Sequence, residues 1–290
     1  GVKTGRTDGD DEAKMTLLAC GINSPLSVKA GLRAEFKPEM VSLAVKETIE
    51  LPADVIDQRF GVSGGNGVTI DAIGDFADGM DAVTILYTNQ NSLSLVVGAV
   101  IADYVSHKIK PYELIESVKQ HPMIAPLIAG GKSLEYIAHW VPESGYHTIP
   151  RLHGNGYLVA GDAGMLFNGL HREGSNMAMA SGKMAAETII EALKTGNVSE
   201  KALAVYRRKL WQSFVMKDMY KYRNFGRFLY EHKEMFTTVP QLLSMAGREM
   251  VTVDGVSKKK KQAIIMQEIN KRTSMLRLAR LFWQAWRSVK

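Results

Sequence analysis

The chain has 290 residues, of which 46% are hydrophobic and 23% charged, and this composition is typical of a globular protein with a sizeable core. No apolar run reaches the roughly 18 residues that a bilayer-spanning helix needs, so we expect a soluble protein or one that lies on a membrane surface. The net charge is +6, and the last twenty residues are basic. We find no nucleic-acid recognition motif, and the basic tail favours an anionic membrane or an acidic partner.

Cysteine and histidine usage excludes two kinds of site. Cys20 is the single cysteine, so it can form no intrachain disulfide and cannot alone hold an iron–sulfur cluster. We interpret it as a small core residue. The seven histidines show no metal-ligand spacing, and we predict no metal site. This cysteine usage suits a reducing compartment, so we expect a cytoplasmic protein.

The first predicted elements are a strand and a short helix. Lys14–Ala19 is apolar enough for a short buried strand. Ser24 is a suitable N-cap and Pro25 suits the first helical position, so a helix to about Ala30 is expected. A strand followed at once by a capped helix is typical of an α/β nucleotide-binding layer.

Residues from about 36 to 146 favour antiparallel strands. The runs with alternating or β-branched residues are 41–45, 83–87 and 92–102. The glycine-containing turns lie at 64–67 and 78–79, and the helical patterns lie at 111–120 and 122–128. This stretch is predicted to be a second, inserted domain.

A strand, a loop and a long helix are predicted between Tyr157 and Lys194. Tyr157–Ala160 forms the strand, and the loop after it carries Asn168, His171, Arg172 and Glu173. The helix begins near Gly174, and Gly196 ends it. The last ninety residues are predicted to be helical, with breaks at Pro240 and Gly255.

This strand–loop–helix unit has the chemistry of a cofactor edge. The strand delivers Asp162 to the carboxyl edge of a sheet, where its carboxylate can accept hydrogen bonds from a sugar or ribityl hydroxyl. Gly161 permits close backbone approach, and the N–H groups at Ser175 and Asn176 can stabilise negative charge. An ordinary Rossmann-like helix after a short loop would give the same spacing, so both interpretations stay open on spacing alone.

The residues themselves resemble a known family. The runs Gly161–Gly164 (GDAG) and His171–Gly182 (HREGSNMAMASG) closely resemble the FixC family of electron-transfer-flavoprotein–quinone oxidoreductases. This family belongs to a class that includes geranylgeranyl reductases and aromatic hydroxylases. Supporting similarities lie at 19–24, 87–89, 92–95, 121–131 and 139–143. No GxGxxG motif for the FAD pyrophosphate occurs, so the resemblance implies an N-terminally incomplete chain.

The resemblance implies an α/β fold with a partial, discontinuous Rossmann-like FAD-binding domain, an inserted antiparallel-sheet substrate domain and a helical C-terminus. The implied ranges are 1–36 and 151–196 for the FAD domain, 37–150 for the quinone-side domain and 197–290 for the helical region. The implied cofactor is FAD, with Gly161, Asp162, Gly174, Ser175 and Asn176 as binding residues. His171 is a candidate for proton transfer, although a structural role in the loop is favoured.

In this family, electrons pass from an electron-transferring flavoprotein through FAD to a quinone, and the resemblance implies the same here. A separate ferredoxin-like subunit would supply the iron–sulfur centre, since Cys20 stands alone. The alternatives are a prenyl reductase or hydroxylase of the same superfamily, or a truncated, non-catalytic piece that acts in complex assembly.

The tail suggests where such a protein contacts its surroundings. Lys271–Lys290 has six basic residues and no acidic one, and its apolar residues fall on one helical face. Trp283 and Trp286 beside arginines suit a membrane interface, so a peripheral position on the cytoplasmic membrane is one expectation. A helix docked on the domain or on a partner subunit is the rival interpretation. The run Lys258–Lys261 is interpreted as a solvated linker.

Overall fold

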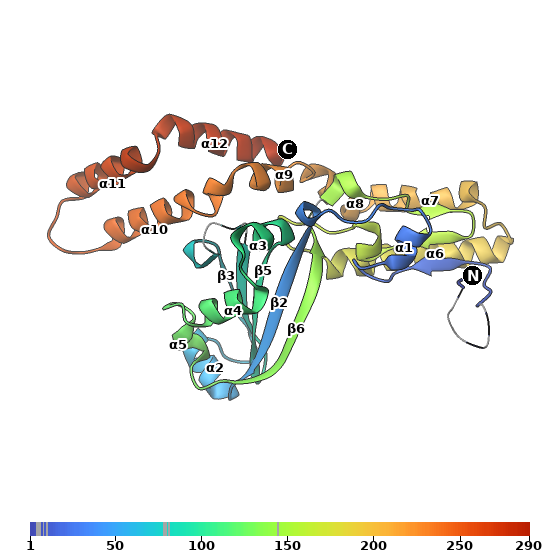
Figure 1. The fold of residues 1–290 in the computed structure, drawn as a ribbon, viewed down its shortest axis with the longest axis horizontal. Coiled ribbons are helices and arrows are strands. Elements are labelled where there is room, and N and C mark those ends of the chain that lie inside the picture. The colour runs from blue at the N-terminus through green and yellow to red at the C-terminus, as the bar shows by residue number, and fades with distance from the viewer. Residues whose placement is uncertain (4–6, 8, 10, 78–79, 81, 144) are drawn as a thin grey trace. The chain divides into compact units, whose positions relative to one another are not determined.

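The computed structural model describes residues 1–3, 7, 9, 11–77, 80, 82–143 and 145–290, which form two units (Figure 1). The first unit comprises Gly1–Val41, Pro142–Arg227 and Arg287–Lys290. The second comprises Ser42–Val141 and Phe228–Trp286, so each unit is discontinuous in sequence. The predicted α/β class is confirmed, while the four domain ranges given above stay a prediction.

The first unit is built on a small sheet with strand order β1-β8-β7. β1 (Thr16–Leu18) runs parallel to β8 (Tyr157–Val159), and β7 (His153–Gly154) pairs with β8 in the antiparallel direction. The central strand β8 is the most buried, because Leu158 and Val159 have no exposed surface. The Asn155–Gly156 turn expected from the sequence joins β7 to β8, with Gly156 in the left-handed region at φ 74°.

Helices pack against this sheet and complete the first core. The helices are α1 (Pro25–Lys29), α6 (Ser175–Thr195), α7 (Glu200–Gln212), α8 (Phe214–Lys221) and α9 (Phe225–Glu231), the last of which ends in the second unit. Figure 1 shows α6 and α7 side by side, and the residues between them include Met177, Leu203 and Tyr206. The Tyr206 hydroxyl donates to the Val159 carbonyl over 2.9 Å and so ties α7 to the central strand.

The second unit contains a five-stranded sheet of order β3-β4-β5-β2-β6. Its strands are β2 (Val41–Glu50), β3 (Thr69–Ala72), β4 (Ala82–Thr88), β5 (Ser92–Val100) and β6 (Lys132–Pro142). β5 pairs with β2 and β4 in the antiparallel direction, as the sequence predicts. Side chains alternate between the two faces of a strand, and Leu93, Leu95 and Val97 all lie on the face that forms the core.

Helices from the segments between the strands contribute to this core. They are α2 (Ala53–Phe60), α3 (Ile101–His107), α4 (Pro111–Lys119) and α5 (Ala125–Ile128), and Figure 1 shows them beside the sheet. The core also contains an ion pair, because Glu47 on β2 is 4% exposed and faces Lys119 at the end of α4. The Lys119 ammonium lies 3.2 and 3.1 Å from the two Glu47 carboxylate oxygens and 2.9 Å from exposed Glu116.

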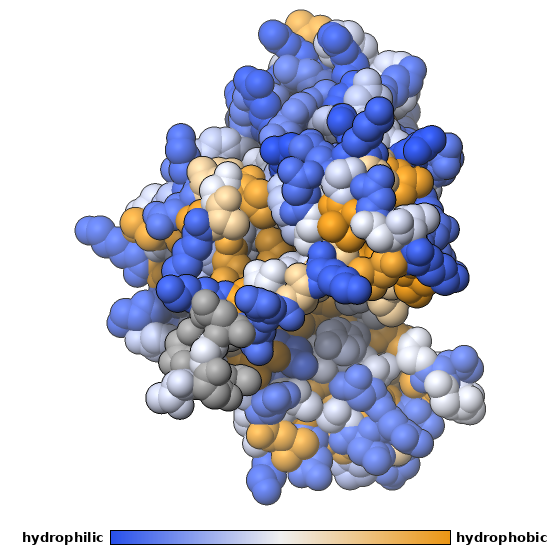
Figure 2. All heavy atoms as spheres, turned by 90° about the vertical axis from the view of Figure 1, so that its right-hand side faces the viewer, coloured by the Kyte–Doolittle hydropathy of each residue, from blue (hydrophilic) through white to orange (hydrophobic). Residues whose placement is uncertain are grey.

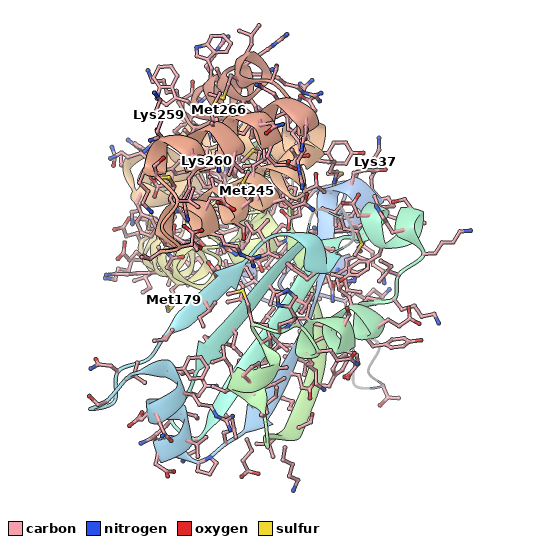
Figure 3. All side chains as sticks on the ribbon, turned by 90° about the vertical axis from the view of Figure 1, so that its left-hand side faces the viewer. Lys37, Met179, Met245, Lys259, Lys260 and Met266 are labelled. Atoms are coloured by element: carbon pink, nitrogen blue, oxygen red, sulfur yellow. The ribbon has the colours of Figure 1, made fainter. Side chains whose placement is uncertain are left out.

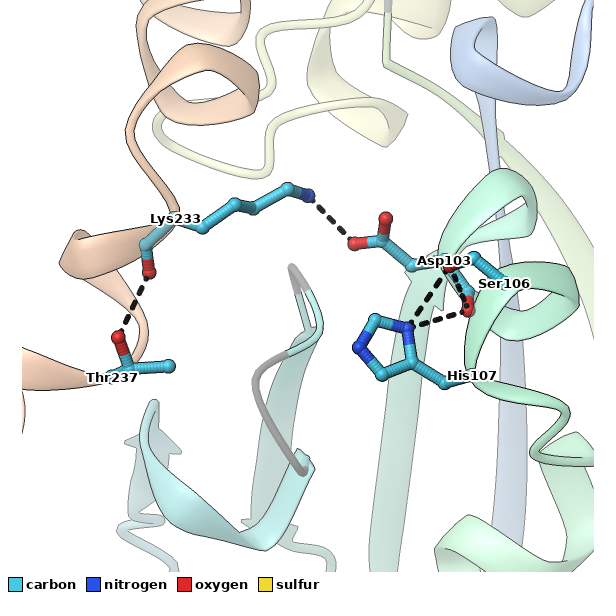
Figure 4. Close-up of polar contacts among 5 residues, drawn as sticks. All are labelled: Asp103, Ser106, His107, Lys233 and Thr237. Atoms are coloured by element: carbon cyan, nitrogen blue, oxygen red, sulfur yellow. Dashed lines mark hydrogen bonds and ion pairs between the residues drawn. The ribbon is translucent and has the colours of Figure 1, made fainter.

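The C-terminal helices belong to the same unit and are tied to α3. They are α10 (Thr238–Val251), α11 (Lys258–Arg272) and α12 (Met275–Ser288). Figure 4 shows Lys233, just before α10, donating over 2.7 Å to the carboxylate of buried Asp103. His107 Nδ1 and the Ser106 hydroxyl lie 3.0 and 3.1 Å from the Asp103 carbonyl, so both polar ends of this residue are engaged.

The lysine run at 258–261 is not a solvated linker, and that interpretation was wrong. It forms the first turn of α11, where Figure 3 labels Lys259 and Lys260. Lys261 is 1% exposed, and its ammonium bonds to the Thr252 carbonyl at 2.7 Å and to Asp254 at 3.0 Å. Hydrogen bonding to this ammonium lowers the pKa of the Asp254 carboxyl. The buried lysine therefore closes the connection between α10 and α11.

Other sequence expectations need smaller corrections. β5 stops at Val100, because α3 begins at Ile101, so the strand does not reach 102. Pro240 does not break a helix, because it lies in the first turn of α10, where a missing N–H costs no intrahelical bond. Helix α5 is shorter than 122–128, and the predicted turn at 78–79 lies outside the described residues.

On the face drawn in Figure 2, hydrophobic side chains reach the surface in patches separated by hydrophilic ones. Across the described ranges, none of the helices combines the length and the hydropathy needed to cross a membrane.

Candidate functional site

The candidate site lies where the parallel strands β1 and β8 of the first unit end. Their register pairs Leu18 with Val159, so the residues that follow both strands emerge at the same edge of the sheet. This is the edge at which open α/β sheets bind cofactors. A single turn of 3₁₀ helix, Gly161–Gly164, follows β8 directly and carries Asp162.

Gly161 fixes the path of the chain out of β8. Its φ is 61°, in the left-handed region, and a Cβ at this position would stand 3.1 Å from the Cβ of Ala178. Its N–H donates to the buried hydroxyl of Ser181 over 3.0 Å, and that hydroxyl donates to the Ala178 carbonyl. Both the conformation and the space therefore require glycine here, and α6 lies directly against the backbone of the turn.

Asp162 lies close to the N-terminus of α6. Its Oδ1 is 3.9 Å from the position that a Cβ would occupy on Gly174, the N-cap of this helix. That Cβ would also stand 3.1 Å from the Phe167 ring. A side chain at 174 would therefore fill the space beside the carboxylate. The structure thus brings together Gly161, Asp162 and Gly174, three of the residues predicted from the sequence.

The first turn of α6 supplies the remaining predicted residues. Ser175 is exposed and Asn176 is half-buried, and the N–H groups at such a helix start have no intrahelical acceptor. They form the positive end of a helix of 21 residues, which favours negative charge nearby. The Asn176 Oδ1 accepts from the Met177 N–H over 2.9 Å, and the Nδ2 of the same amide is a further donor at this helix start.

The loop before α6 is closed on itself. Asn168 and Glu173 exchange two backbone hydrogen bonds of 3.0 and 3.1 Å, and Arg172 between them adopts a left-handed φ of 54°. The Nδ2 of Asn168 is buried and has no hydrogen-bond partner among the described residues. A buried amide without a partner costs free energy, so this donor fits a ligand acceptor. Asn168 was predicted only as a loop residue, because its burial cannot be recognised from the local sequence.

His171 lies at the exposed tip of the same loop. Its ring stands edge-on to the Tyr222 ring, with centroids 4.9 Å apart. The backbone N–H of His171 donates to the Asn168 Oδ1 over 3.4 Å. These contacts describe a residue that packs the loop against the segment after α8. Its suggested part in proton transfer stays a prediction.

Arg33 was not predicted, yet its side chain joins the two loops at the sheet edge. It donates to the Ile22 carbonyl over 2.7 Å and approaches the Met165 sulfur at 3.8 Å. Burial lowers the pKa of this guanidinium, while the Cys20 thiol acts in the opposite direction. Its Nε is buried without a partner among the described residues. Nothing in the local sequence distinguishes this arginine, because its partners lie 11 and 132 residues away.

Two expectations for the turn after β1 differ from the structure. Cys20 is exposed, so its interpretation as a core residue was wrong. Ser24 is the N-cap of α1 and Pro25 its first residue, but the Ser24 hydroxyl makes no capping hydrogen bond. It lies 2.9 Å from the Cys20 sulfur and 2.5 Å from the Ser27 hydroxyl instead.

These residues fit a flavin nucleotide. The edge offers a carboxylate beside a space that a Cβ on Gly174 would fill, the positive end of a helix, and a buried amide donor that has no partner in the described part of the chain. A ribityl chain needs hydrogen-bond acceptors and donors, and the flavin ring favours positive potential beside its pyrimidine side.

Comparison with known proteins places the chain in a family. Residues 225–290 match the family described as the ETF-QO/FixC family C-terminal domain. The chain is 43% identical to Protein FixC of Azotobacter vinelandii over 291 residues, which covers all of this chain and 67% of that protein. It is 42% identical to Protein FixC of Bradyrhizobium diazoefficiens, with 99% and 67% covered. The chain belongs to the FixC family.

Membership in the FixC family confirms the family predicted from the sequence and its class, the flavin-dependent oxidoreductases. The chain spans about two thirds of the length of these FixC proteins, and 58% of Protein FixC of Escherichia coli K12, to which it is 43% identical.

Solved structures show that the fold of this FixC-family chain is shared more widely. A geranylgeranyl bacteriochlorophyll reductase-like protein from Thermoplasma acidophilum superimposes with a TM-score of 0.62 at 17% identity, covering 90% of this chain and 62% of that one. The flavin-dependent brominase Bmp2 superimposes with a TM-score of 0.56 at 16% identity, covering 90% and 63%. At these identities the similarity concerns the fold.

Proposed function

We propose that this chain forms the flavin-facing part of an FAD-dependent oxidoreductase that passes electrons from an electron-transferring flavoprotein to a quinone. The observation that carries the proposal is the edge after β8, where Asp162 lies beside the Gly174 N-cap of α6. Membership in the FixC family supports FAD as the flavin and the named donor and acceptor. When bound, FAD would supply the two-electron chemistry.

Each residue of the edge has a distinct part in holding the cofactor. Asp162 accepts hydrogen bonds from the ribityl chain, and the first N–H groups of α6, at Ser175 and Asn176, stabilise negative charge on the flavin ring. Gly174 keeps the space beside Asp162 open, and Gly161 lets α6 lie close to the turn that carries this carboxylate. The Asn168 Nδ2 donates to a flavin or ribityl oxygen, which would satisfy its buried amide.

A ferredoxin-like subunit is part of the proposal, because the chain holds one cysteine. An iron–sulfur cluster needs several thiolates, which these 290 residues do not provide, and we assign them to a separate ferredoxin-like subunit. Exposed Cys20 is followed by a glycine turn and is too isolated to serve as more than one ligand.

The exposed side of α12 supports contact with the membrane that contains the quinone. Leu276 is 83% exposed, and Phe282, Trp283 and Trp286 are half exposed, whereas Leu281 faces inward. The tail is not one helix, because α11 ends at Arg272 and α12 begins at Met275. Aromatic and aliphatic side chains beside arginines suit the interface of an anionic bilayer.

Flavin binding tests the central claim. The apoprotein of the unmodified chain and of Asp162→Ala is titrated with FAD, and FAD binding is measured from the quenching of flavin fluorescence. We expect the dissociation constant to rise about tenfold, since about 1.5 kcal/mol is typical of a hydrogen bond to a charged group. Asp218→Ala on α8 is the matched control and should bind FAD as the unmodified chain does. Absence of FAD binding in the unmodified chain would favour the assembly role instead.

Electron transfer tests the reaction. The protein, with its subunits, is given reduced electron-transferring flavoprotein and a soluble quinone analogue, and quinol formation is measured. Alkene reduction or hydroxylation in place of quinol formation would contradict this reaction and favour the prenyl reductase or hydroxylase alternative.

Flotation with phosphatidylglycerol vesicles tests the membrane contact. The double variant Trp283→Ser with Trp286→Ser should abolish binding to the vesicles, whereas Leu243→Ser on α10 should not.

A further inference from the structure

A cavity lies in the first unit, between residues other than those proposed to hold flavin. Its volume is about 440 Å³, within the range of small-molecule sites, and it opens between α7 and the segment that leads into β7. None of the predicted flavin-binding residues lines it. Its apolar wall includes Leu152, Leu210 and Met216, and its polar groups come from two opposite sides.

The polar groups of the cavity lie on two walls, one formed by α7 and the other by the segment that enters β7. On α7, Glu200, Arg207 and Trp211 are seven and four residues apart and therefore share one side of the helix. On the opposite wall, Arg151 and His153 are two residues apart in the segment that enters β7. An ion pair between Arg151 and Glu200 joins the two walls.

The side chains that line the cavity carry an excess of positive charge. Two guanidinium groups, Arg151 and Arg207, face one carboxylate, Glu200, which leaves one positive charge uncompensated. Burial of the imidazole lowers the pKa of His153, Glu200 acts in the opposite direction, and both guanidinium groups lower it further. All three charged groups are therefore within electrostatic reach of this imidazole, whose Nδ1 is buried with no partner among the described residues.

An aromatic surface lies beside these charges. The rings of Tyr146 and Trp211 both line the cavity, with centroids 6.2 Å apart at an angle of 79°. Trp211 is 37% exposed, so one part of its ring is open to a ligand. Flat rings next to a cation suit a ligand with an apolar body and one anionic group.

We infer that this cavity is a binding site for a small organic anion, a carboxylate or a phosphate ester carried on a flat apolar body. The anionic group binds Arg207 and the Nδ1 of His153, and the body lies against Trp211 and Leu210. The Arg151–Glu200 pair closes the far side and limits the ligand to one anionic group. This inference does not depend on the proposed flavin chemistry.

The test uses the full chain and two probes that differ in one group. The anionic probe is 8-anilinonaphthalene-1-sulfonate, and the neutral one is N-phenyl-1-naphthylamine, which lacks the sulfonate. Binding is read from energy transfer out of Trp211, the component that disappears in Trp211→Phe. We expect Arg207→Gln to weaken the anionic probe about five- to tenfold and the neutral probe by less than about twofold, as loss of a charged hydrogen-bond partner requires.

The adjacent residue provides the matched control. Arg208 is exposed on the same helix and does not line the cavity, so Arg208→Gln should leave both probes unaffected. Equal weakening by both variants, or equal loss of both probes in Arg207→Gln, would overturn the inference.

Competition on the unmodified chain gives an answer that needs no variant to fold. Phenylacetate or phenylphosphate should displace the sulfonate probe, and 2-phenylethanol should not. The stronger of the two anions identifies the ligand as a carboxylate or a phosphate ester. Equal displacement by 2-phenylethanol would show an apolar cavity without anion selectivity and would also overturn the inference.

Discussion

The two units are held in shape by different means. In the first, the decisive contacts involve the backbone. Gly161 adopts a left-handed conformation and its N–H donates to the Ser181 hydroxyl, and the Tyr206 hydroxyl donates to the carbonyl of Val159 in β8. In the second, buried charged side chains recur, namely Glu47, Asp103 and Lys261, each bonded to an oppositely charged partner. The candidate cofactor edge therefore depends on chain conformation, whereas the second unit adds paired buried charges to an apolar core.

This difference sets which substitutions each unit tolerates. A conformational constraint is broken by a single added methyl group, even when the polarity is unchanged. Small changes of shape near a buried ion pair alter the stability little, whereas removal of one partner lowers the free energy of unfolding, because the other charge is then buried alone. Matched substitutions in the two units can therefore separate the two mechanisms.

The largest effect is expected from Lys119→Met in the second unit. The variant leaves the Glu47 carboxylate, whose side chain is 6% exposed, without its cation. Removal of one partner from a buried pair costs about 3 kcal/mol of unfolding free energy. Urea unfolding at pH 7, followed by segment-resolved hydrogen exchange of β2 and β5, measures this loss.

Glu116→Gln is the control for that prediction. It removes the other carboxylate at Lys119, which is 58% exposed, and exposed pairs contribute at most about 1 kcal/mol. We expect a change of less than about 0.5 kcal/mol, because the Glu47 contact remains. A similar loss in both variants would show that burial of Glu47 is not what makes the pair important.

A smaller effect, of about 2 kcal/mol, is expected from Gly161→Ala in the first unit. The alanine must adopt a φ of 61° and would place its Cβ 3.1 Å from that of Ala178. Gly182→Ala on α6 is the matched control, because a Cβ there has open space, and a helical glycine is usually about 0.5–1 kcal/mol less stable than alanine. Opposite shifts of the urea midpoint are expected, and parallel shifts would contradict the conformational role of Gly161.

The backbone constraints were the part of the site that the sequence could predict. Gly161, Asp162 and Gly174 lie at a strand end and a helix start, and both are recognisable from local patterns. Arg33 and the buried Asn168 amide were missed because their roles depend on distant partners or on burial. The same holds for Lys261, whose place in a lysine run indicates solvent exposure.

The fold of the second unit was predictable in part for a similar reason. β2, β4 and β5 have apolar positions that alternate, since one face is buried. β6 was not predicted, although Leu134, Tyr136, Ala138 and Trp140 occupy alternate positions. Nine of its eleven residues are exposed, so this alternation does not mark a buried face. Helix α2 was also missed, and only Ile56 of its eight residues is buried.

The smallest effect concerns acid and should be confined to the first unit. Burial places the pKa of His153 below its ordinary value of 6.5, so the unfolded chain takes up a proton before the folded one as the pH falls. The free energy of unfolding is then fully retained above pH 6.5 and declines as the pH falls below it. The protection factors of β8 and α7, which are corrected for the intrinsic pH dependence of amide exchange, should therefore fall between pH 7 and pH 5, and His153→Gln should remove this dependence. His147→Gln, in the same cavity wall but hydrogen-bonded to Asn224, should retain it. If the protection factors of β2 and β5 fall equally and His153→Gln changes nothing, the acid sensitivity belongs to the whole chain, and His153 does not set the first unit apart.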